Sequence, residues 1–309
     1  SFPLFYSTSF GGAYWLWMII LFSFVLQAVS YEFQNKLGNF LGVKTFQWLL
    51  LINGILGPLL LGGAVATFFN GSNFVVDKNN IVGGMNPVIS TWANGSHGLD
   101  ALLDVWNLYL GLAVVFLARA LGSFYIMNNV ADQVIRTRAR EKMLINVAGF
   151  LVLFLIFLGR TLWKDGFAYD PVTGIISMEP MKYLRNLLDM WYLAAVLLIG
   201  VVLLLYAVIR TAMDKLYMKG IWPAGIGVVL VVLVLFLIAG WNNTAYYPSN
   251  VDIQSSLTIA NSCSSDFTLR TMSVVSLFIP FVLAYIVYVW HAMDREKITK
   301  EEITEDDIY

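Results

Sequence analysis

Seven stretches of mainly apolar residues follow one another along the chain, with shorter polar segments between them. A helix needs about 20 apolar residues to cross the hydrocarbon layer of a bilayer, and each stretch is about that long. Without water to bond the backbone, each stretch should be helical, and the short alternating segments of a membrane β-barrel do not occur. We therefore predict an all-α fold, a polytopic transmembrane helix bundle with about seven spans in one membrane domain, residues 1–309. The predicted spans are residues 11–31, 47–69, 105–127, 144–163, 187–209, 221–241 and 272–293.

Composition supports a lipid environment and excludes other classes. The chain is 59% hydrophobic and 13% charged, whereas soluble domains carry about 25% charged residues. Its net charge of −1 gives no electrostatic footprint for nucleic acid. The single cysteine, Cys263, cannot form an internal disulfide.

Lysine and arginine are distributed unevenly over the polar connections, which alternate between two sides. One side comprises residues 32–46, 128–143, 210–220 and 292–309 and carries twelve of these cations, whereas the other side carries five. Because cytoplasmic loops are enriched in Lys and Arg, we expect the first side to be cytoplasmic. The protein is then a multi-pass membrane protein with a cytoplasmic C-terminal tail, residues 294–309.

Two features inside or beside the spans predict local geometry. Pro58 and Pro280 lie within spans, and each should kink its helix because proline removes a backbone hydrogen bond. Tryptophan and tyrosine gather at span ends, as in an aromatic belt at the membrane surface; a cofactor box is the alternative interpretation.

No signature of soluble catalysis is present, and histidine is scarce. The two histidines, His97 and His291, fall in a loop and at a span end. A chain that ligates several haems should carry more His or Met side chains inside its helices, so we predict no cofactor and no metal in this chain.

Ionisable residues at or near the membrane are the best functional candidates. Glu32 follows the first span directly; it is either a solvated helix-end acid, paired with Lys36 at i+4, or a group that takes up protons. Arg119 lies deep in its span and either snorkels, pairs with an acid of a neighbouring helix or contacts a partner subunit. Asp100 and Asp104 precede the third span; they either ring an outer vestibule or are solvated acids at a helix N-terminus. We take all four as proton-path candidates.

Four stretches carry a resemblance to a known family. The first runs from Phe2-Pro3-Leu4 to Tyr14 and leads into a span ending Ser30-Tyr31-Glu32-Phe33-Gln34-Asn35-Lys36. The second is Asn107-x-x-x-Gly111. The third, the most specific, is Ser255-Ser256-Leu257-Thr258 with Asn261, then Ser264-Ser265 and Thr268, followed by a helix with Pro280 and Tyr285. The fourth is Lys297-Ile298-Thr299-Lys300-Glu301. Together they resemble subunit II of cytochrome bd-type ubiquinol oxidases.

The resemblance implies a bacterial plasma (inner) membrane enzyme that oxidises membrane quinol and reduces dioxygen to water. It implies that haems b and d lie in a larger partner, subunit I, and that subunit II supports that partner and helps to deliver cytoplasmic protons. Glu32 then corresponds to the acid of the proton path. Family members have at least one further span and a Trp-Asp-Gly-Asn-type segment upstream, which this sequence lacks.

A secondary transporter or multi-span permease is the alternative from another class. Such proteins favour broken helices and polar residues at mid-membrane, often in inverted repeats. Pro58 and Pro280 favour it weakly, but mid-membrane polar groups are few and no repeat is evident.

Overall fold

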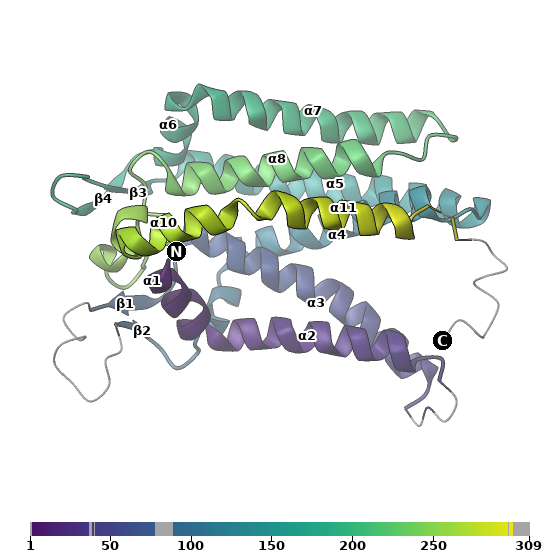
Figure 1. The fold of residues 1–309 in the computed structure, drawn as a ribbon, viewed down its shortest axis with the longest axis horizontal. Helices are drawn as coiled ribbons and strands as arrows, with labels where there is room; N and C mark the ends of the chain where they lie inside the picture. The colour runs from purple at the N-terminus through teal and green to yellow at the C-terminus, as the bar shows by residue number, and fades with distance from the viewer. Residues whose placement is uncertain (1, 37–38, 40, 78–88, 296, 299–309) are drawn as a thin grey trace.

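Seven helices of the computed structural model are long and apolar enough to cross a membrane, among residues 2–36, 39, 41–77, 89–295 and 297–298, which the structure describes (Figure 1). This confirms the predicted all-α bundle. The spans are α2 (Tyr14–Phe33), α3 (Val43–Asn70), α4 (Val105–Asn129), α5 (Gln133–Trp163), α7 (Trp191–Met213), α8 (Ile221–Gly240) and α10 (Asp266–Ser276) continued by α11 (Ile279–Met293).

The two ends of the bundle differ in structure. One end, which we call the hairpin end, carries two antiparallel hairpins, in which Phe74 pairs with Trp92 and Gly166 with Glu179. The other, which we call the basic end, comprises residues 34–36, 130–132, 214–220 and 294–295. The short elements of the hairpin end are α1 (Pro3–Phe5), η1 (Tyr6–Gly12), β1 (Phe74–Val76), β2 (Ser90–Trp92), η3 (Leu99–Leu102), β3 (Gly166–Tyr169), β4 (Ile176–Glu179), α6 (Lys182–Asp189), η4 (Ile253–Ser255) and α9 (Ile259–Ser262).

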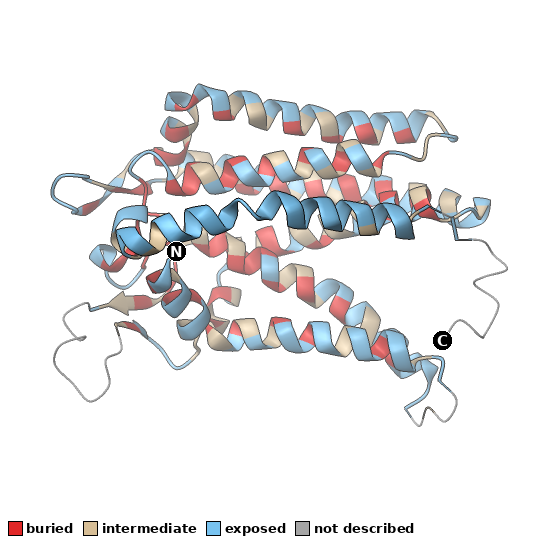
Figure 2. Cartoon of the chain, viewed as in Figure 1, coloured by how far each residue is buried: buried red, intermediate tan, exposed pale blue. Residues whose placement is uncertain are grey.

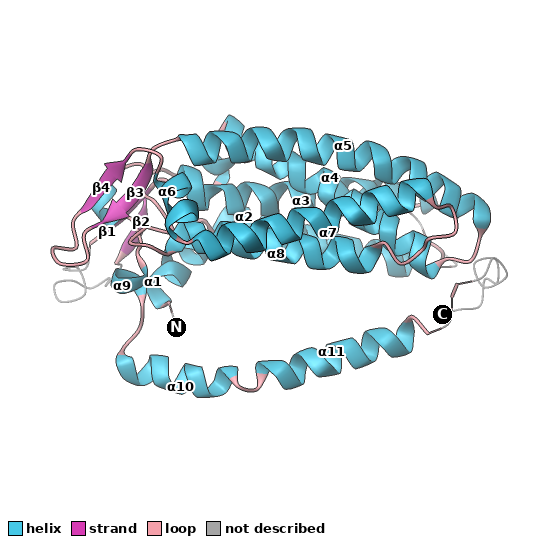
Figure 3. Cartoon of the chain, turned by 90° about the horizontal axis from the view of Figure 1, so that it is seen from above, coloured by secondary structure: helices cyan, strands magenta, loops and turns pink. Residues whose placement is uncertain are grey.

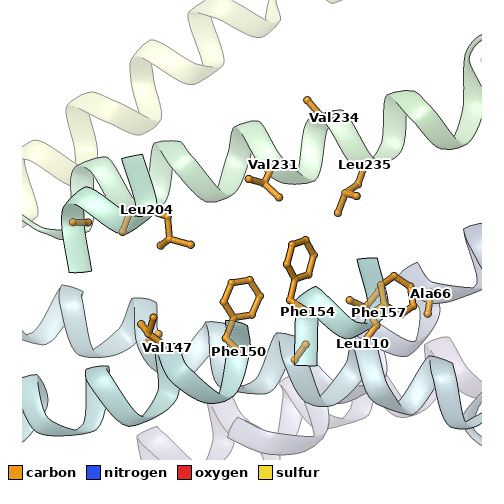
Figure 4. Packing of buried hydrophobic residues seen from close by; sticks show 14 of the residues in the cluster. Ala66, Leu110, Val147, Phe150, Phe154, Phe157, Leu204, Val231, Val234 and Leu235 are labelled. Atoms are coloured by element: carbon orange, nitrogen blue, oxygen red, sulfur yellow. The ribbon is translucent and has the colours of Figure 1, made fainter. Parts of the chain in front are cut away.

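The main core lies between the α3–α4–α5 group and the α7–α8 pair (Figure 2). Figure 4 shows Phe150 and Phe154 of α5 pointing toward Leu204, Val231 and Leu235 of the facing helices. The rings of Phe150 and Phe154 stack with centroids 5.2 Å apart. Because lipid tails are as apolar as these side chains, close fit rather than exclusion of water holds such helices together.

Glycines set the closest helix contacts. A Cβ placed on Gly62 of α3 would lie 2.7 Å from the Cα of Gly111 of α4, and one on Gly111 would lie 2.6 Å from the Leu59 carbonyl oxygen. Gly200 of α7 and Gly227 of α8 meet in the same way, since a Cβ placed on either would lie within 2.8 Å of the other's carbonyl oxygen. Small residues allow backbones to approach this closely in membranes.

The final span lies apart from the others. None of its residues is buried, and Figure 3 shows it running beside the bundle as two helices. The two helices are separated by Leu277 and Phe278, so Pro280 lies in the first turn of α11, where its missing N–H removes no helix hydrogen bond. Pro58, in contrast, lies inside the continuous α3. The predicted kink at position 280 is therefore a break.

Hydrogen bonds at the basic end attach this final span. The Asp294 carboxylate accepts from the Tyr125 hydroxyl and the Asn129 amide, both at 3.0 Å. Ile298 forms a backbone bridge with Val130. Of the predicted tail, positions 296 and 299–309 lie outside the described residues, and so does the end of the fourth matching stretch.

Helix α5 begins at Gln133, although the predicted span begins at position 144. The Asp132 carboxylate caps it by accepting from the backbone N–H of Ile135 at 2.9 Å. Apolar runs locate the part of a helix inside lipid, but a helix continues into water until its sequence stops it. The cations of the predicted 128–143 connection therefore lie on a helix.

Replacing Gly111 by Ala should lower the stability of the protein by about 1–3 kcal/mol, because the new methyl group meets the Leu59 carbonyl and must push α3 from α4. Thermal unfolding in detergent measures the change. Gly54→Ala is the matched control on α3, since a Cβ there meets nothing within 4 Å. Equal effects of the two substitutions would contradict glycine-dependent packing.

Candidate functional site

Glu32 lies in the last turn of α2 at the basic end. Its Oε1 is 2.7 Å from the Nζ of Lys36, so the i+4 ion pair expected from the spacing is present. The two side chains are 51% and 47% exposed. An exposed ion pair of this kind contributes only about 0.3–0.5 kcal/mol to stability. The Glu32 carboxylate is therefore accessible to water, and its contact with Lys36 is easily broken.

The face of α2 that ends at Glu32 is apolar and uncovered. Met18, Phe22, Val25 and Val29 are all exposed, and they precede Glu32 at spacings of four and three residues. These spacings place all five on one side of the helix. The opposite side, with Leu16 and Ile20, is buried against α3. Glu32 thus ends a stripe that faces lipid or another protein.

Arg119 is exposed in the middle of α4. None of the ion pairs between described residues involves it, so pairing with an acid of a neighbouring helix has no counterpart in the described part of the chain. Its backbone carbonyl accepts from the Ser123 hydroxyl at 2.8 Å. Snorkelling and contact with a partner remain the two interpretations.

Asp104 caps α4. Its Oδ1 accepts from the backbone N–H groups of Trp106 at 2.7 Å and Asn107 at 3.0 Å. An aspartate in this position satisfies backbone donors that the first helical turn leaves unpaired. This structural role is what the geometry assigns to Asp104.

Asp100 binds four side chains at the hairpin end. Its carboxylate accepts from Asn73 at 2.6 Å, Ser96 at 2.7 Å, Trp92 at 3.2 Å and Asn94 at 3.3 Å. Partial burial by itself would raise the pKa of Asp100, but these hydrogen bonds outweigh it and leave the pKa below its usual value. The ionised carboxylate therefore holds the loops around β2 together, and it lies far along the chain from Glu32.

A polar cluster that the sequence reasoning missed lies beside Asp104. The Arg160 guanidinium stacks 4.3 Å from the centroid of the Trp106 ring and donates to the Asn70 side chain at 3.0 Å. Asn70 donates to Asn107 at 2.8 Å, and Asn107 donates to the backbone of Ala101 at 2.9 Å. The chain of bonds joins the hairpin ends of α3, α4 and α5.

Lys164, immediately after α5, completes this cluster. Its ammonium donates to the backbone carbonyl of Phe69 near the C-terminus of α3. Burial, followed by repulsion from Arg160, lowers the pKa of Lys164 to about 8, although Asp104 and Asp165 act in the opposite direction. The sequence alone shows only that a lysine follows Trp163. Its burial could not be predicted from that position, because the residues that bury it are distant in the chain.

The two histidines occupy opposite ends of the bundle. The His97 ring packs on Tyr14, with centroids 4.6 Å apart, at the hairpin end. His291 lies exposed in the last turn of α11, at the basic end. They cannot act together on one ligand. Among the described residues, no group of three His, Cys, Asp or Glu side chains could hold a metal ion.

The Ser/Thr residues of the third matching stretch cap short helices. Thr258 and Asn261 form a reciprocal capping box at α9. Ser265 caps α10 by accepting from the backbone N–H of Thr268. Ser256 accepts from the backbone N–H of Ser249 at 2.9 Å. These contacts assign the hydroxyl groups structural roles in caps and turns.

Comparison with known protein families identifies the family of this chain. Residues 1–293 match the family described as cytochrome bd terminal oxidase subunit II. The chain belongs to this family. The resemblance drawn from the four stretches is thereby confirmed, and the transporter alternative is not supported.

Two relatives of this subunit II chain come from two different bacteria. The cytochrome bd-I ubiquinol oxidase subunit 2 of Escherichia coli strain K12 is 25% identical over 97% of this chain and 78% of its own length. The cytochrome bd ubiquinol oxidase subunit 2 of Bacillus subtilis strain 168 is 23% identical over 98% of this chain and 79% of its own length. This chain is thus an oxidoreductase subunit and a multi-pass membrane protein.

The stability of the subunit should rise with pH between about 8 and 10.5 because of Lys164. In this range the unfolded lysine keeps its proton while the folded one has lost it, so unfolding takes up a proton and becomes harder as pH rises. The whole gain is up to about 3 kcal/mol. Unfolding temperatures in detergent across this range measure it.

Lys164→Met should flatten this rise, because it removes the titrating amine. Lys142→Met, which changes an exposed lysine of the same helix, is the control and should keep the wild-type slope. A slope that persists in Lys164→Met would assign the pH dependence to another group.

Proposed function

We propose that this chain is the haem-free subunit II of a quinol:oxygen oxidoreductase in the bacterial plasma membrane. In this proposal it supports a haem-bearing subunit I, which holds haems b and d, and delivers cytoplasmic protons for the reduction of dioxygen to water. Membrane quinol is the electron donor of the complex.

The observation that carries the proposal is the uncovered α2 stripe that ends at Glu32. Met18, Phe22, Val25 and Val29 form a regular apolar face that nothing in the described part of the chain covers. A helix of subunit I can pack against a face with this spacing. Glu32 would then lie where that interface meets water, so a proton taken from water is passed directly into the space between the two subunits.

The chemistry of Glu32 suits proton uptake. A carboxylate can accept a proton from water on one side and release it to another acceptor on the other. Lys36 contacts the carboxylate at 2.7 Å, but both groups are half-exposed, so water screens their attraction. The carboxylate is therefore accessible to water without a large rearrangement.

The haem-free part of the proposal rests on the histidines. A haem with two protein ligands needs two His or Met side chains facing one another across a pocket. His97 and His291 lie at opposite ends of the bundle, so they cannot form a bis-histidine pair. In this proposal the haems and the electron transfer between them are in the partner.

The orientation follows from charge. Arg136, Arg138, Arg140 and Lys142 lie in the first part of α5 at the basic end, where Glu32 also lies. Cytoplasmic surfaces of membrane proteins are rich in such cations. With the basic end in the cytoplasm, Glu32 faces the compartment from which the protons are taken, and the tail after Asp294 is cytoplasmic.

Glu32→Gln in the purified oxidase should slow oxygen consumption with quinol at least fivefold, because the amide cannot bind a proton at neutral pH. The haem absorption of the complex should remain normal. Glu141→Gln is the matched control: it changes an exposed glutamate of α5 near the same end and should leave turnover unchanged.

Two outcomes would overturn parts of the proposal. Unchanged turnover of Glu32→Gln with normal haem absorption would exclude Glu32 from the proton path. Purification of this chain without a haem-bearing partner, or with haem bound to the isolated chain, would contradict its role as the haem-free supporting subunit.

A further inference from the structure

Arg119 leaves a charge on the surface of a membrane-spanning helix. It is the fifteenth residue of α4, is exposed, and has no acidic partner in the described part of the chain. A charged side chain inside the hydrocarbon layer is strongly unfavourable unless it reaches the membrane surface or finds a partner. The Arg119 side chain must therefore either reach the membrane surface or have a partner.

Packing between α4 and α5 brings a second cation to the same side. A Cβ on Gly149 of α5 would lie 2.9 Å from the ring of Phe116 of α4, so these two positions adjoin. Arg119 follows Phe116 by three residues, and Lys142 precedes Gly149 by seven, two turns of the helix. Both spacings keep the side chain on the side where the two helices meet.

Because α4 and α5 run antiparallel, residues after Phe116 lie at the same depth as residues before Gly149. Continuing from Phe116 and Gly149 toward the basic end, Lys142 comes level with Ser123, about one turn beyond Arg119. Lys142 is also exposed and also without an acidic partner among the described residues. Glu141, the preceding residue, points about 100° away around the helix.

The length of α5 places Lys142 at the membrane surface. From Lys142 to Trp163 the helix rises by roughly 32 Å at about 1.5 Å per residue, which matches a hydrocarbon layer of about 30 Å. Trp163, exposed at the other limit, suits the opposite surface. Arg119 then lies about one turn below the headgroups, within reach of its extended side chain.

The residues around Arg119 leave room for a lipid molecule. Gly122, one turn after Arg119, is exposed, and a Cβ there would meet nothing within 4 Å, so space remains beside the guanidinium. Deeper in the membrane, Leu112 and Val152 are exposed apolar residues of the same two helices. They offer an acyl chain a surface below a headgroup held by Arg119.

We propose that Arg119 and Lys142 together bind the phosphate of an anionic phospholipid in the leaflet at the basic end. Two uncompensated cations one turn apart favour a lipid with net negative charge over a zwitterionic one, because the choline or ethanolamine cation of the latter is repelled. Arginine supplies planar, paired donors for phosphate, and lysine supplies a point charge.

Native mass spectrometry of the purified oxidase complex, after incubation with phosphatidylglycerol or phosphatidylcholine, tests the proposal. Wild-type protein should retain phosphatidylglycerol at least fivefold better than the Arg119→Gln/Lys142→Gln variant. It should discriminate against phosphatidylcholine. Arg119→Lys should keep most of the retention because the charge remains.

Lys219→Gln is the matched control, since Lys219 is an exposed lysine of the basic end outside α4 and α5. It should leave phosphatidylglycerol retention at the wild-type level. Equal retention by wild type and the double variant would overturn the proposal, and so would equal binding of the two lipids. Loss of a haem-bearing subunit from the double variant, with lipid retention unchanged, would assign this surface to a protein partner instead.

Discussion

No water is available inside the hydrocarbon layer to hydrogen-bond a peptide group, and the whole structure depends on this constraint. It makes each span a helix whose backbone bonds are satisfied internally, and it removes the hydrophobic effect as the force between helices. What remains is close contact, and the glycines supply it: Gly62 against Gly111, and Gly200 against Gly227. Between the two helix groups, Phe150 and Phe154 of α5 line an apolar cavity together with Leu204, Val231 and Leu235.

Polar chemistry is consequently pushed to the two ends, where it does different work. At the hairpin end, Asp100 and Arg160 hold loops and helix ends together through neutral partners such as Asn70 and Asn73. At the basic end the pair of Glu32 with Lys36 is half-exposed, and Asp294 accepts the two hydrogen bonds that attach the final span. The Glu32 carboxylate is thus accessible to water, whereas the Asp100 carboxylate is tied to four side chains.

Apolar run length was sufficient to predict the number and type of the spans, because a bilayer imposes one length on every helix. The Glu32–Lys36 pair was also predictable, since it depends only on spacing along one helix. The start of α5 was not predictable, because the cap at Asp132 and the charged turns after it lie in water. Apolar run length does not mark the part of a helix that lies outside the lipid. Nor was the cluster around Lys164 predictable, because its partners come from α3 and α4. The position of Asp104 at a helix N-terminus was predictable, since the predicted span and α4 both begin at Val105.

The weak attachment of α10 and α11 bears on how the protein is made. This span contributes no buried residue, and its contacts concentrate at Asp294 and Ile298, which meet the α4–α5 turn. A ribosome completes α2 to α8 first, so their core can form before the final helix leaves the tunnel. Docking of that helix is then a late step governed by a few hydrogen bonds in water. It can proceed, or wait for a partner, without disturbing the bundle already inserted.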